Sequence, residues 1–307
     1  MPKNKSTSGL SNRVRIFYTN ITYGCNSNCV FCYSHNTKHT KSTYNEISVD
    51  ALVEYWDRMG VCENDRIIIN GGEPLLHTNF IGIISAARKY GCEILIYTNG
   101  RLLSTLDITM LDKYCRFVIP IHGHEKLHDE ITRVKGSYGE MMDGIRRISL
   151  CRALLDIKVI INHVMANNYD DYKKTEEALL QLPDINSVHI TKMADTIVSQ
   201  RNKYPSVTSE MSSECTQKIY ELFWKKCTVK IFDTCIKKVV GISFDFTEMK
   251  KNISVHFKDA QNEFDVKLEK PYLNCMDTCD WKDICQSAVG EYTVLEINKG
   301  RFSVGLE

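Results

Sequence analysis

Short apolar runs alternate with amphipathic stretches through the first two-thirds of the chain. Several of these runs are almost continuously apolar, which is typical of strands in a parallel sheet that is buried on both faces. The alternation predicts an α/β fold with right-handed crossovers between parallel strands. The expected strands are 14–18, 66–70, 93–97, 116–121, 157–161 and 187–191.

Between the strands, apolar residues recur at helical spacing. In one stretch they fall at i, i+3, i+4 and i+7, from Val49 to Trp56, and Gly60 supplies a C-terminal stop. Residues 80–87 repeat this pattern before Gly91. Six such βα units predict a partial, TIM-like (β/α)6 barrel, and chemistry then belongs at the carboxyl ends of the strands.

The pattern changes after residue 195. Residues 199–213 are polar and contain Pro205, as in a linker, and a helix is expected over 209–226. The alternating segments 240–246 and 253–257 predict a hairpin. We therefore expect three parts. They are a polar tail (1–13), the barrel (14–195) and a small cysteine-rich α+β domain with its linker and helix (196–307).

Composition excludes several classes of protein. The formal net charge is +1, so no overall basic field favours nucleic-acid binding. No apolar run approaches the ~18 residues that a membrane helix requires. The polar N-terminus lacks the apolar segment of a signal peptide. We therefore expect a cytoplasmic protein without a membrane partner.

Thirteen cysteines are unusual for such a protein. In a reducing compartment, clustered cysteines indicate metal ligands rather than disulfides. One group is Cys25, Cys29 and Cys32, and the other is Cys275, Cys279 and Cys285. Four scattered cysteines are expected to be small buried hydrophobes, namely Cys62, Cys92, Cys115 and Cys151.

The first group follows the first predicted strand directly, so it lies in the first βα loop. Three thiolates at these spacings can surround one iron–sulfur cubane and leave one iron open to another ligand. A zinc site with His35 as fourth ligand is the alternative that the spacing alone leaves open.

The pattern Cys25-x3-Cys29-x2-Cys32, with Phe31 before the last cysteine, resembles the signature of the radical S-adenosylmethionine (radical SAM) superfamily. The resemblance implies a [4Fe–4S] cluster whose open iron chelates S-adenosylmethionine. It also implies one-electron cleavage to a 5′-deoxyadenosyl radical that abstracts hydrogen from a substrate. A flavodoxin- or ferredoxin-type electron donor is then expected.

The next two strands end in further motifs of the family. Gly71, Gly72, Glu73 and Pro74 match its GGEP motif, which implies binding of the methionyl ammonium, with Glu73 as the acceptor. The glycines are expected to let the backbone approach the ligand. Thr98-Asn99-Gly100 at the third strand matches a tripeptide that lies near the ribose and methionine in many relatives. These ordered motifs favour the cluster over zinc.

Two weaker candidates follow the fourth strand. Pro120 is expected to mark the end of that strand or a bulge, and His122 is the candidate contact to the ribose. Arg133 lies in a stretch that also resembles the family and is expected to bind the cofactor carboxylate bidentately. A solvated surface arginine is the other interpretation of Arg133.

The second cysteine group resembles the end of SPASM or twitch auxiliary-cluster domains. It departs from them because three residues, not two, separate Cys275 from Cys279, and because Val289 stands at the fourth cysteine position. The resemblance implies one auxiliary [4Fe–4S] cluster on Cys275, Cys279, Cys285 and Cys235, with Cys227 as the substitute for Cys235. Zinc on the same thiolates is the alternative.

The resemblance leaves two classes of substrate. The first is a ribosomally synthesised peptide that is crosslinked, joined by a thioether or epimerised. Either a separate leader-peptide-binding protein or direct recognition of the peptide is then expected, because few residues precede the first strand. The second is a sugar or aminocyclitol that is dehydrogenated or epimerised. A non-catalytic iron–sulfur or zinc scaffold conflicts with the two strand-end motifs.

Overall fold

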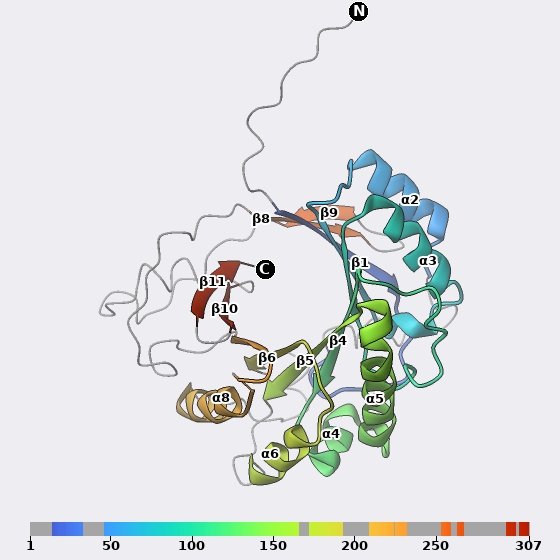
Figure 1. Ribbon diagram of the computed structural model, residues 1–307. Coiled ribbons are helices and arrows are strands. Elements are labelled where there is room, and N and C mark those ends of the chain that lie inside the picture. The colour runs from blue at the N-terminus through green and yellow to red at the C-terminus, as the bar shows by residue number, and fades with distance from the viewer. Residues whose placement is uncertain are drawn as a thin grey trace, which may run out of the picture.

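A parallel sheet forms the centre of the molecule. The computed structural model describes residues 14–32, 46–165, 172–192, 209–223, 225–231, 253–258, 263–266, 293–298 and 301–306. Within these ranges one 11-stranded sheet has the order β11-β10-β7-β6-β5-β4-β3-β2-β1-β8-β9. Strands β1 to β7 are parallel and adjacent in chain order, and the sheet curves with helices on its outer side (Figure 1). The predicted α/β class is confirmed.

All six predicted strands are present. Two of them extend four residues beyond their predicted ends, because β1 continues from residue 18 to 22 and β5 from 161 to 165. The parallel strands are β1 (Val14–Thr22), β2 (Arg66–Gly71), β3 (Glu93–Tyr97), β4 (Cys115–Ile121), β5 (Lys158–Met165), β6 (Ser187–Lys192) and β7 (Thr228–Ile231). The helices are α2 (Val49–Arg58), α3 (Phe80–Ala87), α4 (Glu125–Thr132), α5 (Ser137–Leu155), α6 (Tyr172–Leu180) and α8 (Ser209–Phe223).

The ends of the first helices follow local rules. The Ser48 hydroxyl caps α2 by accepting a hydrogen bond from the Ala51 N–H at 3.2 Å. Gly60 follows the helix with φ +59°, and Gly91 ends the segment after α3 with φ +66°. Glycine reaches this left-handed region without the steric cost of a Cβ. Both predicted helix stops are confirmed.

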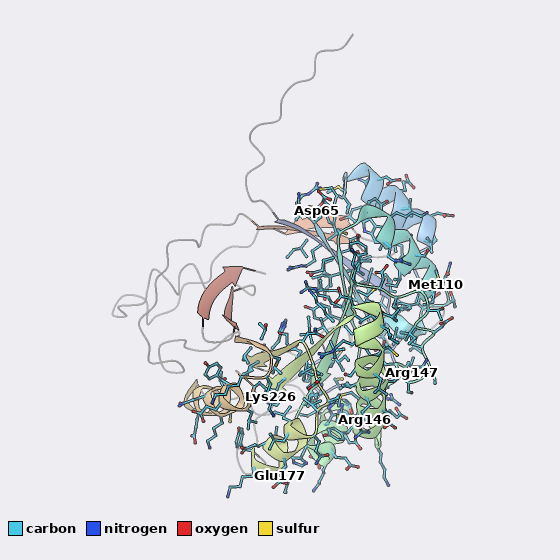
Figure 2. All side chains as sticks on the ribbon, viewed as in Figure 1. Asp65, Met110, Arg146, Arg147, Glu177 and Lys226 are labelled. Atoms are coloured by element: carbon cyan, nitrogen blue, oxygen red, sulfur yellow. The ribbon has the colours of Figure 1, made fainter. Side chains whose placement is uncertain are left out.

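Each strand places alternate side chains on opposite faces of the sheet, and two separate apolar clusters result. The larger cluster fills the space between sheet and helices and contains Phe17, Ile67, Phe117 and Val188. A smaller cluster lies on the concave face and consists of Ile16, Ile68, Leu95, Val118 and Ile160, one from each of β1 to β5. Figure 2 shows Met110 and Glu177 on the outer surface of the helical layer. The concave face of the sheet thus carries an apolar cluster of its own.

Pro120 lies inside β4, where a proline removes a hydrogen-bond donor. The Val118 carbonyl accepts from the Thr98 N–H on the β3 side of β4. In a parallel strand every second residue bonds to the same neighbour, so the position of Pro120 also faces β3. Strand β3 ends at Tyr97, before the level of Pro120. The N–H that proline lacks would therefore have had no β3 carbonyl to bond to.

The parallel sheet has a seventh strand where six were predicted. β7 pairs in parallel with β6, and α8 joins β6 to β7 as the sixth crossover. This four-residue strand was missed because Thr228–Ile231 is too short for its alternation to stand out. The predicted boundary at residue 195 lies outside the described residues, and α8 packs on the barrel core through Ile219 and Phe223.

Four further strands extend the sheet at its edges. β8 (Ile253–Lys258) runs parallel to β1 and antiparallel to β9 (Glu263–Val266). β10 (Thr293–Asn298) runs antiparallel to both β7 and β11 (Arg301–Leu306). The antiparallel partner of β8 is thus β9. The segment 240–246, which was predicted to form a hairpin with 253–257, lies outside the described residues. Among the helices that are described, none combines the length and apolar character that crossing a membrane requires.

An ion pair with a buried carboxylate and a partly exposed arginine ties the start of β1 to the loop before β2. Asp65, labelled in Figure 2, accepts from the Arg15 Nε at 2.9 Å and the Arg15 Nη2 at 2.5 Å, and from the Cys62 N–H at 2.9 Å. Its side chain is 2% exposed. Arg15 also donates to the carbonyls of Met59 and Gly60, which end α2.

We predict that Asp65→Asn lowers the free energy of unfolding by about 3 kcal/mol, because it leaves the Arg15 guanidinium without its charged partner. Asp143→Asn is the matched control, since its ion pair with Arg146 is exposed on both sides and is worth at most about 1 kcal/mol. Urea unfolding followed by circular dichroism measures both changes. Equal midpoints for the two variants would contradict the assignment.

Candidate functional site

Three loops meet at the carboxyl ends of the first three strands. We call them the cysteine loop (residues 23–32, after β1), the GGEP loop (71–74, after β2) and the TNG loop (98–101, after β3). Strands β1, β2 and β3 are neighbours in the sheet, so the three loops are neighbours too. The predicted motifs are brought together at the expected edge of the barrel.

The cysteine loop carries Cys25, Cys29 and Cys32, and all three side chains are partly exposed. The Cys32 N–H donates to the Cys29 carbonyl at 3.2 Å, and the Ser27 N–H lies 3.4 Å from the Cys25 sulfur. In the described part of the chain, no three His, Cys, Asp or Glu side chains are arranged around a common metal position. The donor set itself, three thiols in one short loop, fits an iron–sulfur cluster. His35, the alternative zinc ligand, lies outside the described residues.

The cysteine loop is fixed to the C-terminal end of α4. The Asn28 N–H donates to the Thr132 carbonyl at 3.0 Å, and the Val30 N–H donates to the Ile131 carbonyl at 2.9 Å. The last carbonyls of a helix have no partner within it, so the loop satisfies two of them. Val30 and Phe31 also pack on Leu127 and Ile131. Phe31, which was predicted to contribute to the cofactor site, thus helps to anchor the loop.

The two glycines of the GGEP loop allow the loop to approach the segment before Cys25. The Gly72 N–H donates to the Thr22 carbonyl at 2.8 Å, and the Glu73 N–H donates to the Gly24 carbonyl at 2.7 Å. A Cβ at Gly71 would lie 2.2 Å from the Thr22 oxygen, and one at Gly72 would lie 2.1 Å from the Gly24 oxygen. The glycines therefore make room for the protein's own backbone, and their approach to a ligand stays a prediction.

Glu73 is fully buried, with 0% exposure, and its carboxylate joins two loops. Oε1 accepts from the Thr98 hydroxyl at 2.7 Å and the Leu75 N–H at 3.1 Å, and Oε2 accepts from the Asn99 N–H at 2.8 Å. Burial raises the pKa of Glu73, while these donors and the nearby Arg101 charge act in the opposite direction. The predicted acceptor of an ammonium group already accepts three bonds within the protein.

The remaining predicted residues of these loops support the same junction. Pro74 is buried and begins the short 3-10 helix Pro74–Leu76, where a proline costs no hydrogen bond. Thr98 is 3% exposed, and its hydroxyl also accepts from the Gly100 N–H at 3.1 Å. The Asn99 side chain reaches the cysteine loop, where its Nδ2 donates to the Asn26 Oδ1 at 2.6 Å. Asn99 therefore contacts both the GGEP loop and the cysteine loop.

Arg101, the residue that follows the TNG tripeptide, was not predicted from the sequence to belong to the site. Its Nη1 donates to the Asn26 carbonyl, and its Nε donates to the Glu140 carboxylate in the first turn of α5 at 2.5 Å. The Arg101 side chain is only 13% exposed. Its place directly after a recognised motif was the available signal, but arginine at a strand end is common on protein surfaces.

His122 is buried directly beneath the cysteine loop. Its ring meets Phe31 edge-on, with 5.1 Å between the ring centroids, and stacks on His128 at 5.0 Å. Burial, together with His128 and His163, lowers the pKa of His122 well below its usual value, so the imidazole is neutral. At 2% exposure, His122 supports the loop through Phe31, and its predicted contact to a ribose stays a prediction.

Arg133 lies one residue beyond α4, in the left-handed region with φ +56°. It is exposed and borders a surface hollow of about 560 Å³ that α4 and the following turn line. The turn is held by Asp129, whose carboxylate accepts from the Gly136 and Tyr138 N–H groups and the Ser137 hydroxyl, and these bonds lower its pKa. Bidentate binding of a carboxylate by Arg133 stays a prediction.

The second cysteine group, Cys275, Cys279 and Cys285, and its predicted partner Cys235 lie outside the described residues. The substitute ligand Cys227 packs on the barrel core beside β7, and burial raises its pKa to about 11. Its role as the substitute ligand stays a prediction.

The four scattered cysteines differ in their surroundings. Cys92 and Cys115 are fully buried in the core, as predicted, and Cys151 is partly exposed. Cys62 is exposed, so the prediction that it is a buried hydrophobe was wrong. The reason is its position in the turn before Asp65, where its N–H donates to Asp65 and its sulfur lies 4.0 Å from the Arg15 Nη2 at the surface.

We predict that Gly72→Ala destabilises the protein by at least about 2 kcal/mol and lowers iron incorporation on anaerobic reconstitution, because the new methyl group separates the GGEP and cysteine loops. Gly139→Ala is the matched control, since a Cβ there meets no atom within 4 Å, and alanine in α5 is expected to stabilise by about 0.5–1 kcal/mol. Thermal unfolding and iron quantification measure both effects. The close contact would be unimportant if Gly72→Ala bound iron and melted like the wild type.

Comparisons with known proteins identify relatives for the barrel region. The AdoMet-dependent heme synthase of Methanosarcina barkeri is 24% identical over 176 residues, which cover 56% of this chain and 49% of that protein. The sporulation killing factor maturation protein SkfB of Bacillus subtilis is 23% identical over 153 residues, 49% of this chain and 37% of that protein. The matched region thus spans half or less of these two relatives.

Solved structures with the same fold include SuiB of Streptococcus suis. Its complex with S-adenosylmethionine has a TM-score of 0.56 and 13% identity, and the match covers 81% of this chain and 59% of SuiB. The sequence profile of the Radical SAM superfamily matches residues 19–179, from within β1 to within α6, and so includes all three loops. The chain therefore belongs to the radical SAM superfamily, as its strand-end motifs predicted.

Proposed function

We propose that this chain is a radical SAM enzyme that modifies a ribosomally synthesised peptide by crosslinking, thioether formation or epimerisation. The observation that carries the catalytic part is the direct hydrogen bonding of the cysteine loop to the GGEP and TNG loops. A bound [4Fe–4S] cluster and S-adenosylmethionine would supply the electron and the 5′-deoxyadenosyl radical. Membership of the superfamily implies both cofactors.

The protein's own residues position this chemistry. Cys25, Cys29 and Cys32 are the thiolate ligands. Gly71 and Gly72 hold the GGEP loop at contact distance from the backbone that leads into Cys25, and Glu73 fixes the TNG loop beside it. Preorganisation of this kind lowers the cost of binding, because the loops do not need to become ordered around the ligand.

Two relatives support a peptide substrate. SkfB is a maturation protein for the sporulation killing factor of B. subtilis. SuiB has also been solved bound to its precursor peptide SuiA, and that structure matches this chain with a TM-score of 0.56 over 81% of its length. The heme synthase shows that the same barrel serves small molecules in other members, so the experiment must compare both classes of substrate.

The C-terminal cysteines complete the proposal. Cys235, Cys275, Cys279 and Cys285 would hold an auxiliary [4Fe–4S] cluster in a SPASM- or twitch-like domain. A flavodoxin- or ferredoxin-type protein would supply the electron, and a separate protein would bind the leader of the peptide.

We predict that Cys29→Ala abolishes release of 5′-deoxyadenosine after anaerobic reconstitution and dithionite reduction, since two thiolates cannot hold the cubane. Cys62→Ala, which removes an exposed thiol outside the cysteine loop, is expected to release as much 5′-deoxyadenosine as the wild type. Cys279→Ala should keep part of the cleavage and lose product. Chromatography with mass spectrometry measures 5′-deoxyadenosine. Cleavage of S-adenosylmethionine by Cys29→Ala at the wild-type rate would contradict the assignment of Cys29 as a cluster ligand.

The substrate class is tested by adding candidates to the reduced enzyme. Precursor peptides encoded beside the gene are expected to be modified and to change mass by the loss of hydrogen, or to incorporate deuterium from solvent on epimerisation. Nucleotides, porphyrins and aminocyclitols serve as the comparison. Turnover of one of these small molecules, with no peptide modified, would replace the peptide proposal.

A further inference from the structure

We propose that Arg101 is a positioning residue of the cysteine loop and that its positive charge favours reduction of the cluster. This inference rests on the proposed function, because it concerns the same cluster. It goes beyond that function by giving a role to a residue outside the recognised motifs.

The contacts of Arg101 converge on the segment between the first two cysteine ligands. Its Nη1 donates to the Asn26 carbonyl and lies 3.5 Å from the Ser27 hydroxyl. Asn99 bonds to the same two residues through its Nδ2, at 2.6 Å to the Asn26 Oδ1 and 3.4 Å to the Ser27 oxygen. The Ser27 N–H in turn points at the Cys25 sulfur. Arg101 is thus connected to a ligand sulfur through the backbone of Asn26 and Ser27.

The other side of Arg101 is held by α5. The Arg101 Nε donates to the Glu140 carboxylate, which belongs to the first turn of that helix, where a negative charge is favourable. A planar guanidinium can bond to a carbonyl and a carboxylate at fixed angles at the same time, whereas a lysine ammonium on its flexible stem cannot reproduce this geometry. Arg101 therefore links α5, the TNG loop and the cysteine loop.

The charge of Arg101 is close enough to act on the site. It opposes the rise in the pKa of the buried Glu73, which shows that its field reaches the junction of the loops. The side chain is 13% exposed, so solvent screens this charge only partly, while the Glu140 side chain is 51% exposed and is screened more. Reduction adds an electron to the cluster, and a fixed cation nearby stabilises the added negative charge.

The charge and the geometry are separated by three variants and one control. Arg101→Gln removes the charge, Arg101→Lys keeps the charge but loses the two-sided geometry, and Glu140→Gln removes the negative partner. Arg147→Gln is the control, because the Arg147 guanidinium also donates to backbone carbonyls, those of Ser104 and Leu106, yet neither of these bonds reaches the cysteine loop. Arg147 is labelled on α5 in Figure 2.

The reconstituted full-length variants are compared by redox titration with electron paramagnetic resonance and by iron and sulfide analysis. For Arg101→Gln we expect about a tenfold fall in the ratio of reduced to oxidised cluster at fixed poise, a potential about 59 mV more negative. Glu140→Gln should shift the potential in the opposite direction and by less. Arg101→Lys should keep the wild-type potential and bind less iron at limiting supply. Arg147→Gln should match the wild type in both reduction potential and iron content.

The inference is overturned if Arg101→Gln and Glu140→Gln leave the potential unchanged or move it in the same direction, or if Arg147→Gln reproduces the effect of Arg101→Gln. Should Arg101→Gln fail to fold, the sign of the Glu140→Gln shift decides, because Glu140 is exposed at the helix surface. A wild-type protein that forms no iron–sulfur cluster would instead overturn the proposed function itself.

Discussion

The buried carboxylate of Glu73 is the interaction on which the arrangement of the site depends. It has no exposure to water, and a carboxylate in such a place is tolerated only where hydrogen bonds replace its hydration. Thr98, Asn99 and Leu75 provide those bonds from two loops. Because all three groups donate, the arrangement suits the ionised carboxylate. Loss of either oxygen would remove hydrogen bonds that join the GGEP and TNG loops.

The cysteine loop is held from two sides by groups that have no role in ligation. On one side the GGEP loop bonds to the backbone at Thr22 and Gly24, and on the other side the last carbonyls of α4 accept from Asn28 and Val30. His122 supports the loop from below through Phe31. The loop that carries the cysteines is therefore shaped by main-chain contacts with the GGEP loop and α4.

The barrel and the rest of the chain contribute differently to function. The first four βα units contain every strand-end motif, and the superfamily profile covers them. Relatives that share this region include an AdoMet-dependent heme synthase and a sporulation killing factor maturation protein, so the shared loops do not by themselves identify the molecule that is acted on. Specificity must come from groups that reach the same edge of the barrel from elsewhere.

The sequence by itself determined the six long strands, the first helices and the three strand-end motifs, because strand and helix periodicity and ligand spacing are local properties. It did not find β7, whose four residues are too few to show a period, or Arg101, which becomes significant only beside Asn26. Only the tertiary structure showed that Gly71 and Gly72 lie against the backbone of Thr22 and Gly24. The distance between two loops depends on the register of neighbouring strands, which no single segment contains.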